Sequence, residues 1–234
     1  MEPLKEFFHD KDVQSVLDIG TGTGDFLHVL TTVFPGAAIT GVDPDSNSME
    51  VAARKFQEVT FQKMGAEKLL FKANTFDVAG ISMALHHLPK IQKSLKEIKR
   101  VVKPGGWIIV SELVSDNLNP AQEVHKMIHH FRSRIDRILG VSHRETFKKA
   151  EIIQMIKDAG ISIQFYFDYN QSENPAESKG DIEEKVEKMT QLLEKIKGQP
   201  EYDLLQPQIS EIKEKALQYG FQLATRVVIV GRNY

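Results

Sequence analysis

Three glycines at alternate positions, Gly20, Gly22 and Gly24, follow a short apolar run and precede a helical pattern. Glycine at such positions permits a tight turn and lets a ligand touch the backbone, because no Cβ is in the way. Asp43 ends the next apolar run, about 20 residues farther on, where a carboxylate can accept hydrogen bonds from both hydroxyls of a ribose. The spacing therefore predicts a site for a cofactor that contains a nucleoside.

The charge of this loop separates two classes of cofactor. A dinucleotide would place its pyrophosphate on the N-terminus of the following helix. Asp18 and Asp25 bracket the loop, and Asp25 stands where the dinucleotide pattern has its last glycine. A carboxylate repels a phosphate but suits a cationic group such as an α-ammonium or a sulfonium. Asp25 alone is equally compatible with a helix cap, so the argument depends on the two acids together.

Histidines form a second set of residues that could do chemistry. His86 and His87 follow the fourth apolar run, where one of them could act as a base or orient an acceptor; an imidazole bonded to the backbone is the alternative. His125 and His129 are four residues apart on one face of a predicted helix. That spacing can bind a metal, but surface histidines are commoner on a basic helix, so we predict no metal site.

Two further charged residues could orient an acceptor. Glu112 ends the fifth apolar run and is equally suited to cap a helix. Arg144 precedes a helical pattern, where it could bind an acidic group of the acceptor or neutralise Glu145. Together with His125 and His129, Glu112 and Arg144 are the predicted acceptor-binding residues.

The elements that position these residues alternate in type over the first half of the chain. Strands are predicted at 15–19, 37–42, 59–61, 76–83 and 107–112, and helices at 25–34, 46–56 and 91–101. The strands are nearly continuous apolar runs, as expected when both faces are covered. The pattern predicts an α/β fold of βαβ units with a doubly wound sheet.

The rhythm changes after residue 112. Helices are predicted at 120–139 and 148–159, a strand at 161–169, a loop at 170–179, two helices between 182 and 216, and a last strand at 221–230. We predict a single domain, residues 1–234, with a cofactor-binding half (1–112), a helical lid (113–160) and a helical insertion (170–220) before the last strand. The apolar faces of the insertion need a cover, most simply the sheet and alternatively a second copy in a homodimer.

Composition excludes several classes of protein. The chain has 30 basic and 32 acidic residues, which makes a dedicated nucleic-acid binder an unfavoured interpretation. It has no cysteine, which excludes disulfides, thiolate metal sites, iron–sulfur clusters and cysteine nucleophiles. Neither a long apolar run nor a signal pattern is present, so we expect a cytoplasmic protein that does not enter a membrane.

Taken together, the glycine loop, Asp43 and the stretches that follow them resemble the class I S-adenosylmethionine-dependent methyltransferases, in particular the type 11 methyltransferases that act on small molecules. The resemblance is carried, in the family's order and spacing, by residues 17–24, 41–44, 76–78, 84–88, 95–101 and 103–106. It implies a Rossmann-like, seven-stranded mixed sheet of order 3-2-1-4-5-7-6 with the last strand antiparallel, and no metal in most members.

The resemblance also implies which residues hold S-adenosylmethionine across the carboxyl ends of the first strands. They are Asp18, Gly20, Thr21, Gly22, Gly24, Asp43, Pro44, Ala66, Glu67 and Met83. The chain departs from the family at 64–67, where relatives often read Gly-Asp-Ala-Glu and this sequence has Met-Gly-Ala-Glu. Adenine recognition would then depend on backbone groups around Ala66 or on another side chain.

We therefore expect transfer of a methyl group to an O, N or C nucleophile of a small molecule by in-line displacement, with a base needed only if the acceptor holds its proton. The tetrad that presents a planar amine of adenine or glutamine is missing at 82–85, and the lack of cysteine excludes the covalent route to C5 of pyrimidines. Two alternatives stay open: a non-catalytic cofactor-binding regulatory or assembly protein, and a NAD or flavin oxidoreductase.

Overall fold

The structure, a computed structural model, describes residues 1–170 and 179–234. The chain divides into two compact units. The sheet unit comprises Met1–Glu112, Ala150–Phe167 and Val227–Tyr234, and the bundle unit comprises Leu113–Lys149 and Asp168–Arg226. Among the described residues, no helix combines the length and the apolar character needed to cross a bilayer.

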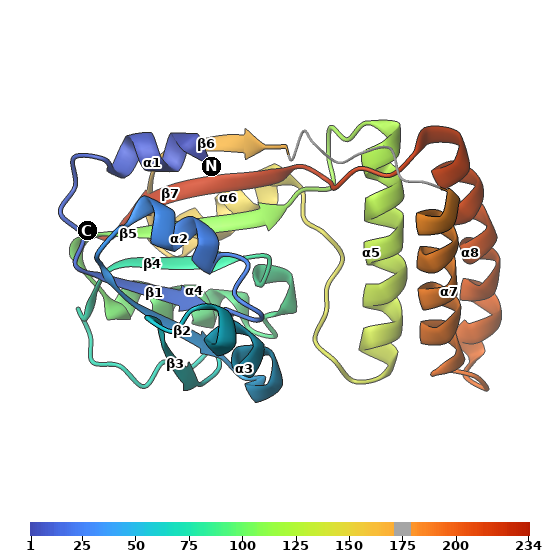
Figure 1. Ribbon diagram of the computed structural model, residues 1–234, viewed down its shortest axis with the longest axis horizontal. Helices are drawn as coiled ribbons and strands as arrows, with labels where there is room; N and C mark the ends of the chain where they lie inside the picture. Colours follow the sequence, from blue (N-terminus) through green and yellow to red (C-terminus); the bar gives the residue numbers. More distant parts are fainter. Residues whose placement is uncertain (171–178) are drawn as a thin grey trace. The chain divides into compact units, whose positions relative to one another are not determined.

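Within the described part of the chain, seven strands form one sheet in the order β3-β2-β1-β4-β5-β7-β6 (Figure 1), which confirms the predicted order. The strands are β1 (Ser15–Ile19), β2 (Ala38–Asp43), β3 (Thr60–Lys63), β4 (Phe76–Ser82), β5 (Val102–Leu113), β6 (Ser162–Tyr169) and β7 (Arg226–Arg232). The pairs from β3 to β5 are all parallel. Their carboxyl ends therefore lie along one edge of the sheet, where doubly wound folds bind ligands.

β7 runs antiparallel to β5, as predicted. Gly105 N–H donates to Asn233 O at 2.6 Å and Asn233 N–H to Gly106 O at 2.9 Å, whereas Val114 N–H donates to Thr225 O at 2.9 Å. Residue numbers thus rise along one strand as they fall along the other. The sheet therefore has the mixed topology that the resemblance implied.

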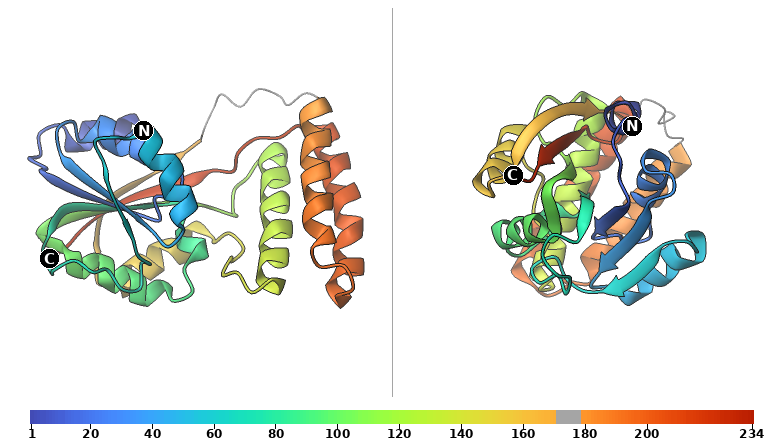
Figure 2. Two further views of the ribbon diagram at one scale, coloured as in Figure 1. Left: turned by 60° about the horizontal axis from the view of Figure 1, so that its bottom comes forward. Right: turned by 90° about the vertical axis from the view of Figure 1, so that its left-hand side faces the viewer.

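Helices cover both faces of the sheet. Figure 2 shows α1 (Glu2–Phe8), α2 (Leu27–Val33) and α3 (Ser46–Lys55) on one face, and α4 (Ile91–Val101) and α6 (Lys149–Asp158) on the other. The first face is closely packed, since a Cβ on Gly80 in β4 would lie 2.7 Å from the ring of Phe26. Such packing leaves the strand ends as the place where a ligand can reach the backbone.

The sequence places the start of β5 too late. We expected residues 103–106 to form a turn before a strand at 107, but β5 begins directly after α4, at Val102. The side-chain amide of Asn233 donates to the carbonyls of Lys99, Val102 and Lys103, at 3.0, 2.7 and 3.3 Å. Asn233 therefore provides the hydrogen bonds that the carbonyl groups at the end of α4 need. Because Asn233 is more than 100 residues away in the sequence, no local pattern reveals this interaction.

The bundle unit contains α5 (Pro120–Ile138), α7 (Lys179–Glu194) and α8 (Pro200–Tyr219). A capping box between Asn119 and Gln122, with Pro120 in the first turn, starts α5. Their buried cluster consists of Val124, Phe131, Ile135, Ile182, Met189, Leu193, Ile196, Leu205, Ile212 and Ala216. The insertion helices α7 and α8 thus share a core with α5, whereas we expected the sheet to cover them.

Two boundaries in the second half differ from the prediction or fall outside the structure. The last strand was expected from 221 but begins at Arg226, because Gln222 N–H donates to Ala121 O and Ala224 N–H donates to the ring of His125. The predicted loop 170–179 lies almost wholly outside the described residues. Of the region predicted as a lid, α5 belongs to the bundle unit and most of α6 to the sheet unit.

Candidate functional site

The glycine loop leaves β1 in a conformation that excludes side chains. Gly20, Gly22 and Gly24 have φ values of 69°, 50° and 93°, in the region that disfavours other residues. A Cβ on Gly20 would lie 2.6 Å from the Cβ of Ala84, and one on Gly24 would lie 2.7 Å from the ring of Phe56. Side chains at Gly20 and Gly24 would therefore collide with neighbouring elements, in addition to blocking the approach of a ligand to the loop.

Hydrogen bonds tie this loop to the end of β2. Gly20 N–H and Thr21 N–H both donate to Val42 O, at 2.8 and 3.0 Å. Gly22 N–H donates to Asp43 Oδ2 at 3.0 Å, and the other oxygen of Asp43 accepts from Asp45 N–H at 2.8 Å. The predicted ribose-binding acid is thus fixed between the glycine loop and the start of α3.

Asp18 is buried below the loop, with 1% of its surface exposed. Its Oδ2 accepts from Thr21 Oγ1 at 2.6 Å, whereas its Oδ1 is buried with no hydrogen-bond partner among the described residues. Burial raises the pKa of Asp18 to about 7, and the charge of Asp43 adds to the rise. An unsatisfied carboxyl oxygen that resists ionisation fits a cationic ligand group, which would supply both the missing donor and the missing charge.

The other predicted cofactor residues follow the strands of the same edge. Pro44 comes directly after β2, Ala66 and Glu67 come after β3, and Met83 comes after β4. Met83 has φ 54°, a strained conformation for a side-chain-bearing residue, held by a 2.9 Å bond from its N–H to Ser111 O. Glu67 Oε1 is also buried without a hydrogen-bond partner among the described residues.

Asp25 does not act as the cap of α2. The helix begins at Leu27, its cap residue is Phe26, and no side-chain hydrogen bond caps it. The side chain of Asp25 is exposed beside the loop. This removes the capping interpretation of Asp25 and leaves the loop flanked by one buried and one exposed carboxylate.

His86 and Glu112 form a buried pair in the sheet unit, with 3% and 1% of their side chains exposed. His86 N–H donates to Glu112 Oε2 at 3.3 Å, and His86 Nδ1 lies 2.8 Å from Glu112 Oε1. Because a carboxylate can only accept, Nδ1 carries a proton and Nε2 holds the lone pair in the neutral ring. His87 is exposed, and its ring centroid lies 4.3 Å from that of His86. The structure thus joins a predicted catalytic residue to a predicted acceptor-binding one.

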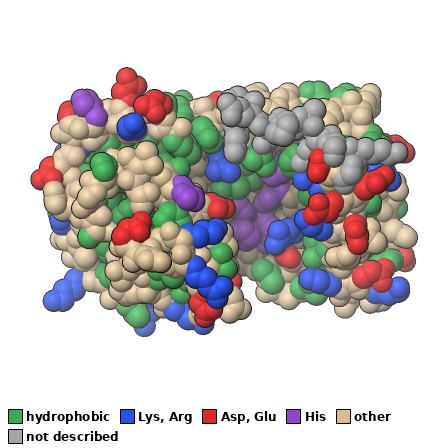
Figure 3. Space-filling view, in the orientation of Figure 1, with side chains coloured by type: hydrophobic (Ala, Val, Ile, Leu, Met, Phe, Trp, Pro, Cys, Tyr) green, Lys and Arg blue, Asp and Glu red, His purple; other side chains and the backbone are tan. Residues whose placement is uncertain are grey.

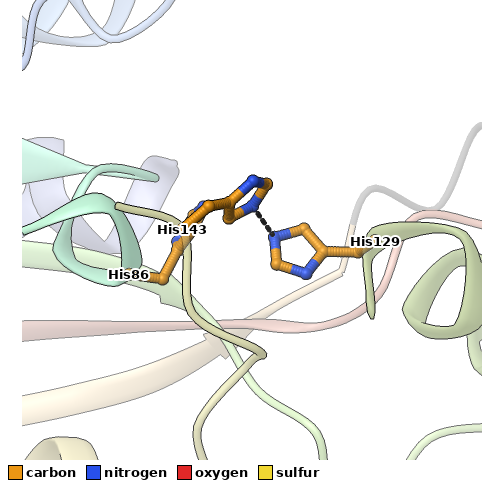
Figure 4. A group of neighbouring side chains, drawn as sticks. All are labelled: His86, His129 and His143. Atoms are coloured by element: carbon orange, nitrogen blue, oxygen red, sulfur yellow. Dashed lines mark hydrogen bonds between the residues drawn. The ribbon is translucent and has the colours of Figure 1, made fainter. Parts of the chain in front are cut away.

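The two histidines predicted on one face of α5 have different partners. Nδ1 of His125 accepts from Ala224 N–H at 2.9 Å, and burial, assisted by Arg226 and Lys185, lowers the pKa of this ring to about 4. His125 is therefore neutral and joins α5 to the segment before β7. His129 instead meets His143, with 3.2 Å between their Nε2 atoms (Figure 4).

Arg144 is exposed and does not neutralise Glu145, the second of its two predicted roles. The carboxylate of Glu145 is approached instead by Arg134, Arg137 and His130, at 3.1, 3.6 and 3.6 Å. On the face drawn in Figure 3, basic and acidic side chains are interspersed over the bundle unit rather than gathered by sign. Among the described residues of this face, the mixture therefore forms no continuous basic patch of the kind that binds a nucleic acid.

Comparison with known proteins matches these features to one family. Residues 17–110, which include the glycine loop, Asp43 and His86, match the model of a methyltransferase domain. The chain is 30% identical over 132 residues to a demethylmenaquinone methyltransferase of Chlorobaculum parvum, a match that covers 56% of this chain and 54% of that protein. It is 36% identical over 99 residues to the ubiquinone/menaquinone biosynthesis C-methyltransferase UbiE of Desulfotalea psychrophila, covering 42% and 40%. The chain thus spans about half the length of the curated relatives it matches.

A solved structure gives the same fold. Phosphoethanolamine N-methyltransferase 2 of Haemonchus contortus, in complex with S-adenosyl-L-methionine, superposes with a TM-score of 0.57 at 19% identity. That match covers 99% of this chain and 51% of the other. The Rossmann-like fold that the sequence predicted is confirmed.

Proposed function

We propose that this chain, whose residues 17–110 match the model of a methyltransferase domain, transfers a methyl group from S-adenosylmethionine to a carbon of a small hydroxylated ring such as a reduced quinone. The observation that carries the choice of cofactor is the buried carboxyl of Asp18, whose Oδ1 has no hydrogen-bond donor among the described residues and whose pKa burial raises to about 7. The ring-carbon acceptor is suggested by the relatives, whose names specify methylation of menaquinone and ubiquinone precursors.

The residues present fit S-adenosylmethionine. Asp43 would accept from the ribose hydroxyls, the glycine loop and Asp18 would receive the methionine part, and the segment at Ala66 and Glu67 would take the adenine. A diphosphate at the same loop would face Asp18 and Asp25, which is unfavourable. The loop therefore argues against the nicotinamide or flavin alternative.

Bound S-adenosylmethionine supplies a methyl group already activated by the sulfonium, so the protein needs mainly to align the acceptor and exclude water. A ring carbon becomes nucleophilic when the neighbouring hydroxyl loses its proton. We assign that step to His86, whose Nε2 would take the proton. Glu112 would hold Nδ1–H and stabilise the charged ring that forms, so Glu112 is a positioning residue rather than a catalytic one.

The test is transfer of a labelled methyl group by the purified chain. Candidate acceptors are a reduced demethylated naphthoquinone with a short tail, a catechol and a primary amine, with the methylated atom identified by NMR. We expect label on a ring carbon of the naphthoquinol. His86→Gln should lower kcat by about a hundredfold or more with little change in affinity for S-adenosylhomocysteine, as for loss of a general base.

His28→Gln is the matched control, because His28 is an exposed histidine on α2. It should leave kcat unchanged. Tight binding of S-adenosylhomocysteine without transfer to any acceptor in cell extracts would contradict the proposal and favour a non-catalytic cofactor-binding protein. Transfer to the amine alone would keep the methyltransferase and refute the ring-carbon acceptor.

A further inference from the structure

Two histidines of the bundle unit face each other through their Nε2 atoms, which can serve as metal ligands. His129 lies on α5, and His143 lies in the segment between α5 and α6. Their Nε2 atoms are 3.2 Å apart, and their rings are nearly perpendicular, at 85°, with centroids 4.8 Å apart (Figure 4). The contact joins a helix to a loop segment 14 residues away.

The separation matches that of two ligands on one ion. Imidazole nitrogens bind Zn²⁺ at about 2.0–2.1 Å, and a tetrahedral angle then places two of them about 3.3 Å apart. The pair is within about 0.1 Å of that separation. An N–H···N hydrogen bond has a similar length, so distance alone does not distinguish the two arrangements.

The surroundings of His143 favour the metal. His143 Nδ1 lies 2.6 Å from Asp136 Oδ2, and only 3% of the side chain of His143 is exposed. Asp136 therefore keeps the proton on Nδ1 and leaves the lone pair on Nε2, directed at His129. A carboxylate behind a histidine is the arrangement that fixes and strengthens imidazole ligands at metal sites.

The charge and the donor atoms of the site limit which metal ions it can bind. Asp136 supplies a negative charge, partly offset by Arg132, whose Nε lies 3.5 Å from it. His130 is engaged with Thr146 Oγ1 at 2.7 Å, so it is not a third ligand from α5 in this arrangement. Two neutral imidazoles suit Zn²⁺, Ni²⁺ or Cu²⁺ rather than Mg²⁺ or Ca²⁺, which prefer oxygen.

We propose that His129 and His143 bind a divalent transition metal such as Zn²⁺ through their Nε2 atoms, with Asp136 fixing His143 and water completing the coordination. On binding, the proton of His129 moves from Nε2 to Nδ1, so both rings stay neutral. Both proposed ligands belong to the bundle unit.

Calorimetric titration of the metal-free full chain with Zn²⁺ at pH 7.5 tests this site. We expect one ion per chain, with affinity lowered at least tenfold in His129→Gln and in His143→Gln. Asp136→Asn should weaken binding by about tenfold, as for loss of a partner behind a ligand. His9→Gln, which removes an exposed histidine at the end of α1, should titrate like the wild type.

Equal Zn²⁺ affinity in the wild type and in both histidine variants would overturn the proposal, as would no Zn²⁺ binding at all. If either variant fails to fold, the wild type still decides. In a ¹⁵N spectrum of its imidazoles, Zn²⁺ should shift the Nε2 resonance of His143, recognised by the strongly bonded proton on its Nδ1. An Nε2 resonance that stays in place at saturating Zn²⁺ would refute the site.

Discussion

Asp18 is the residue on which the choice of cofactor depends most. Its carboxyl is buried, has one donor in Thr21 Oγ1 and lies near the second acid, Asp43. Burial favours the neutral form and raises the pKa to about 7, so the free protein has a group that a cation would ionise. The cofactor's α-ammonium provides such a cation, and binding should therefore depend on pH.

Affinity for S-adenosylhomocysteine should fall as the pH drops through 7 in the wild type and stay nearly level in Asp18→Asn. Below pH 7 the carboxyl of the free protein holds a proton that binding must expel, which lowers affinity by up to about tenfold per pH unit. Calorimetry between pH 5.5 and 8 measures this slope. The same slope in the variant would contradict the role given to Asp18.

Stability of the free protein should have the opposite dependence. Because the folded pKa of about 7 lies above the ordinary aspartate value of 3.8, the native state holds more protons than the unfolded chain between those values. The contribution of Asp18 is fully present below pH 4 and is lost as the pH rises through 7, by about 4 kcal/mol at most. Urea unfolding should show this loss of stability in the wild type. The same loss in Asp18→Asn would refute the contribution assigned to Asp18.

Among the elements, the glycine loop is closely constrained by its neighbours. Gly20→Ala should abolish cofactor binding and destabilise the protein by about 1–3 kcal/mol, because the added Cβ would overlap the Cβ of Ala84. Gly36→Ala is the matched control, since Gly36 also has a positive φ, of 86°, but nothing lies within 4 Å of its added Cβ.

Unfolding midpoints and calorimetric affinities, measured on both variants, distinguish the backbone strain of a positive φ from the steric overlap of the added Cβ with Ala84. Gly36→Ala should show a modest loss of stability and normal binding. If Gly20→Ala bound S-adenosylhomocysteine as tightly as Gly36→Ala does, the close approach of the loop to Ala84 could not be required for the site.

Local patterns predicted the elements that bear the cofactor residues. The alternation of apolar runs and helices placed the strands, and the glycines after β1 with Asp43 after β2 placed the loop, because each signal lies within a few residues. The joining of His86 to Glu112 was not predicted, since these residues are 26 positions apart and meet only when β4 pairs with β5. For the same reason the sequence did not indicate that His129 pairs with His143 rather than with its helical neighbour.

At the scale of the whole molecule, the chain builds two compact units, and the buried residues of the bundle helices form a cluster of their own. The spacing of apolar residues predicted the helices of the second unit, but periodicity does not tell against which element the apolar face of each helix packs. Ile182 and Leu205 were thus expected to meet the sheet, whereas they share a core with Phe131 of α5. The glycine loop, Asp43, Glu67 and Met83 all belong to the sheet unit.

Phe131→Ala should therefore destabilise the bundle unit without removing cofactor binding. Phe131 is 1% exposed, and truncating a buried phenylalanine costs about 3–5 kcal/mol. Leu204→Ala, at a position on α8 that is 71% exposed, should cost about 0.5 kcal/mol or less. Chemical denaturation followed by circular dichroism, with affinity for S-adenosylhomocysteine measured in parallel, checks both; loss of binding in folded Phe131→Ala would contradict the assignment of the site to the sheet unit.

The central claim is that the acidic glycine loop accepts a cationic nucleoside and rejects a diphosphate. Calorimetric titration of the full chain with S-adenosylhomocysteine and with NAD⁺ tests it most directly. The account predicts binding of S-adenosylhomocysteine at least a hundredfold tighter than that of NAD⁺, weakened more than tenfold by Asp43→Ala as charge-assisted bonds are lost. NAD⁺ binding as tight as that of S-adenosylhomocysteine would contradict it.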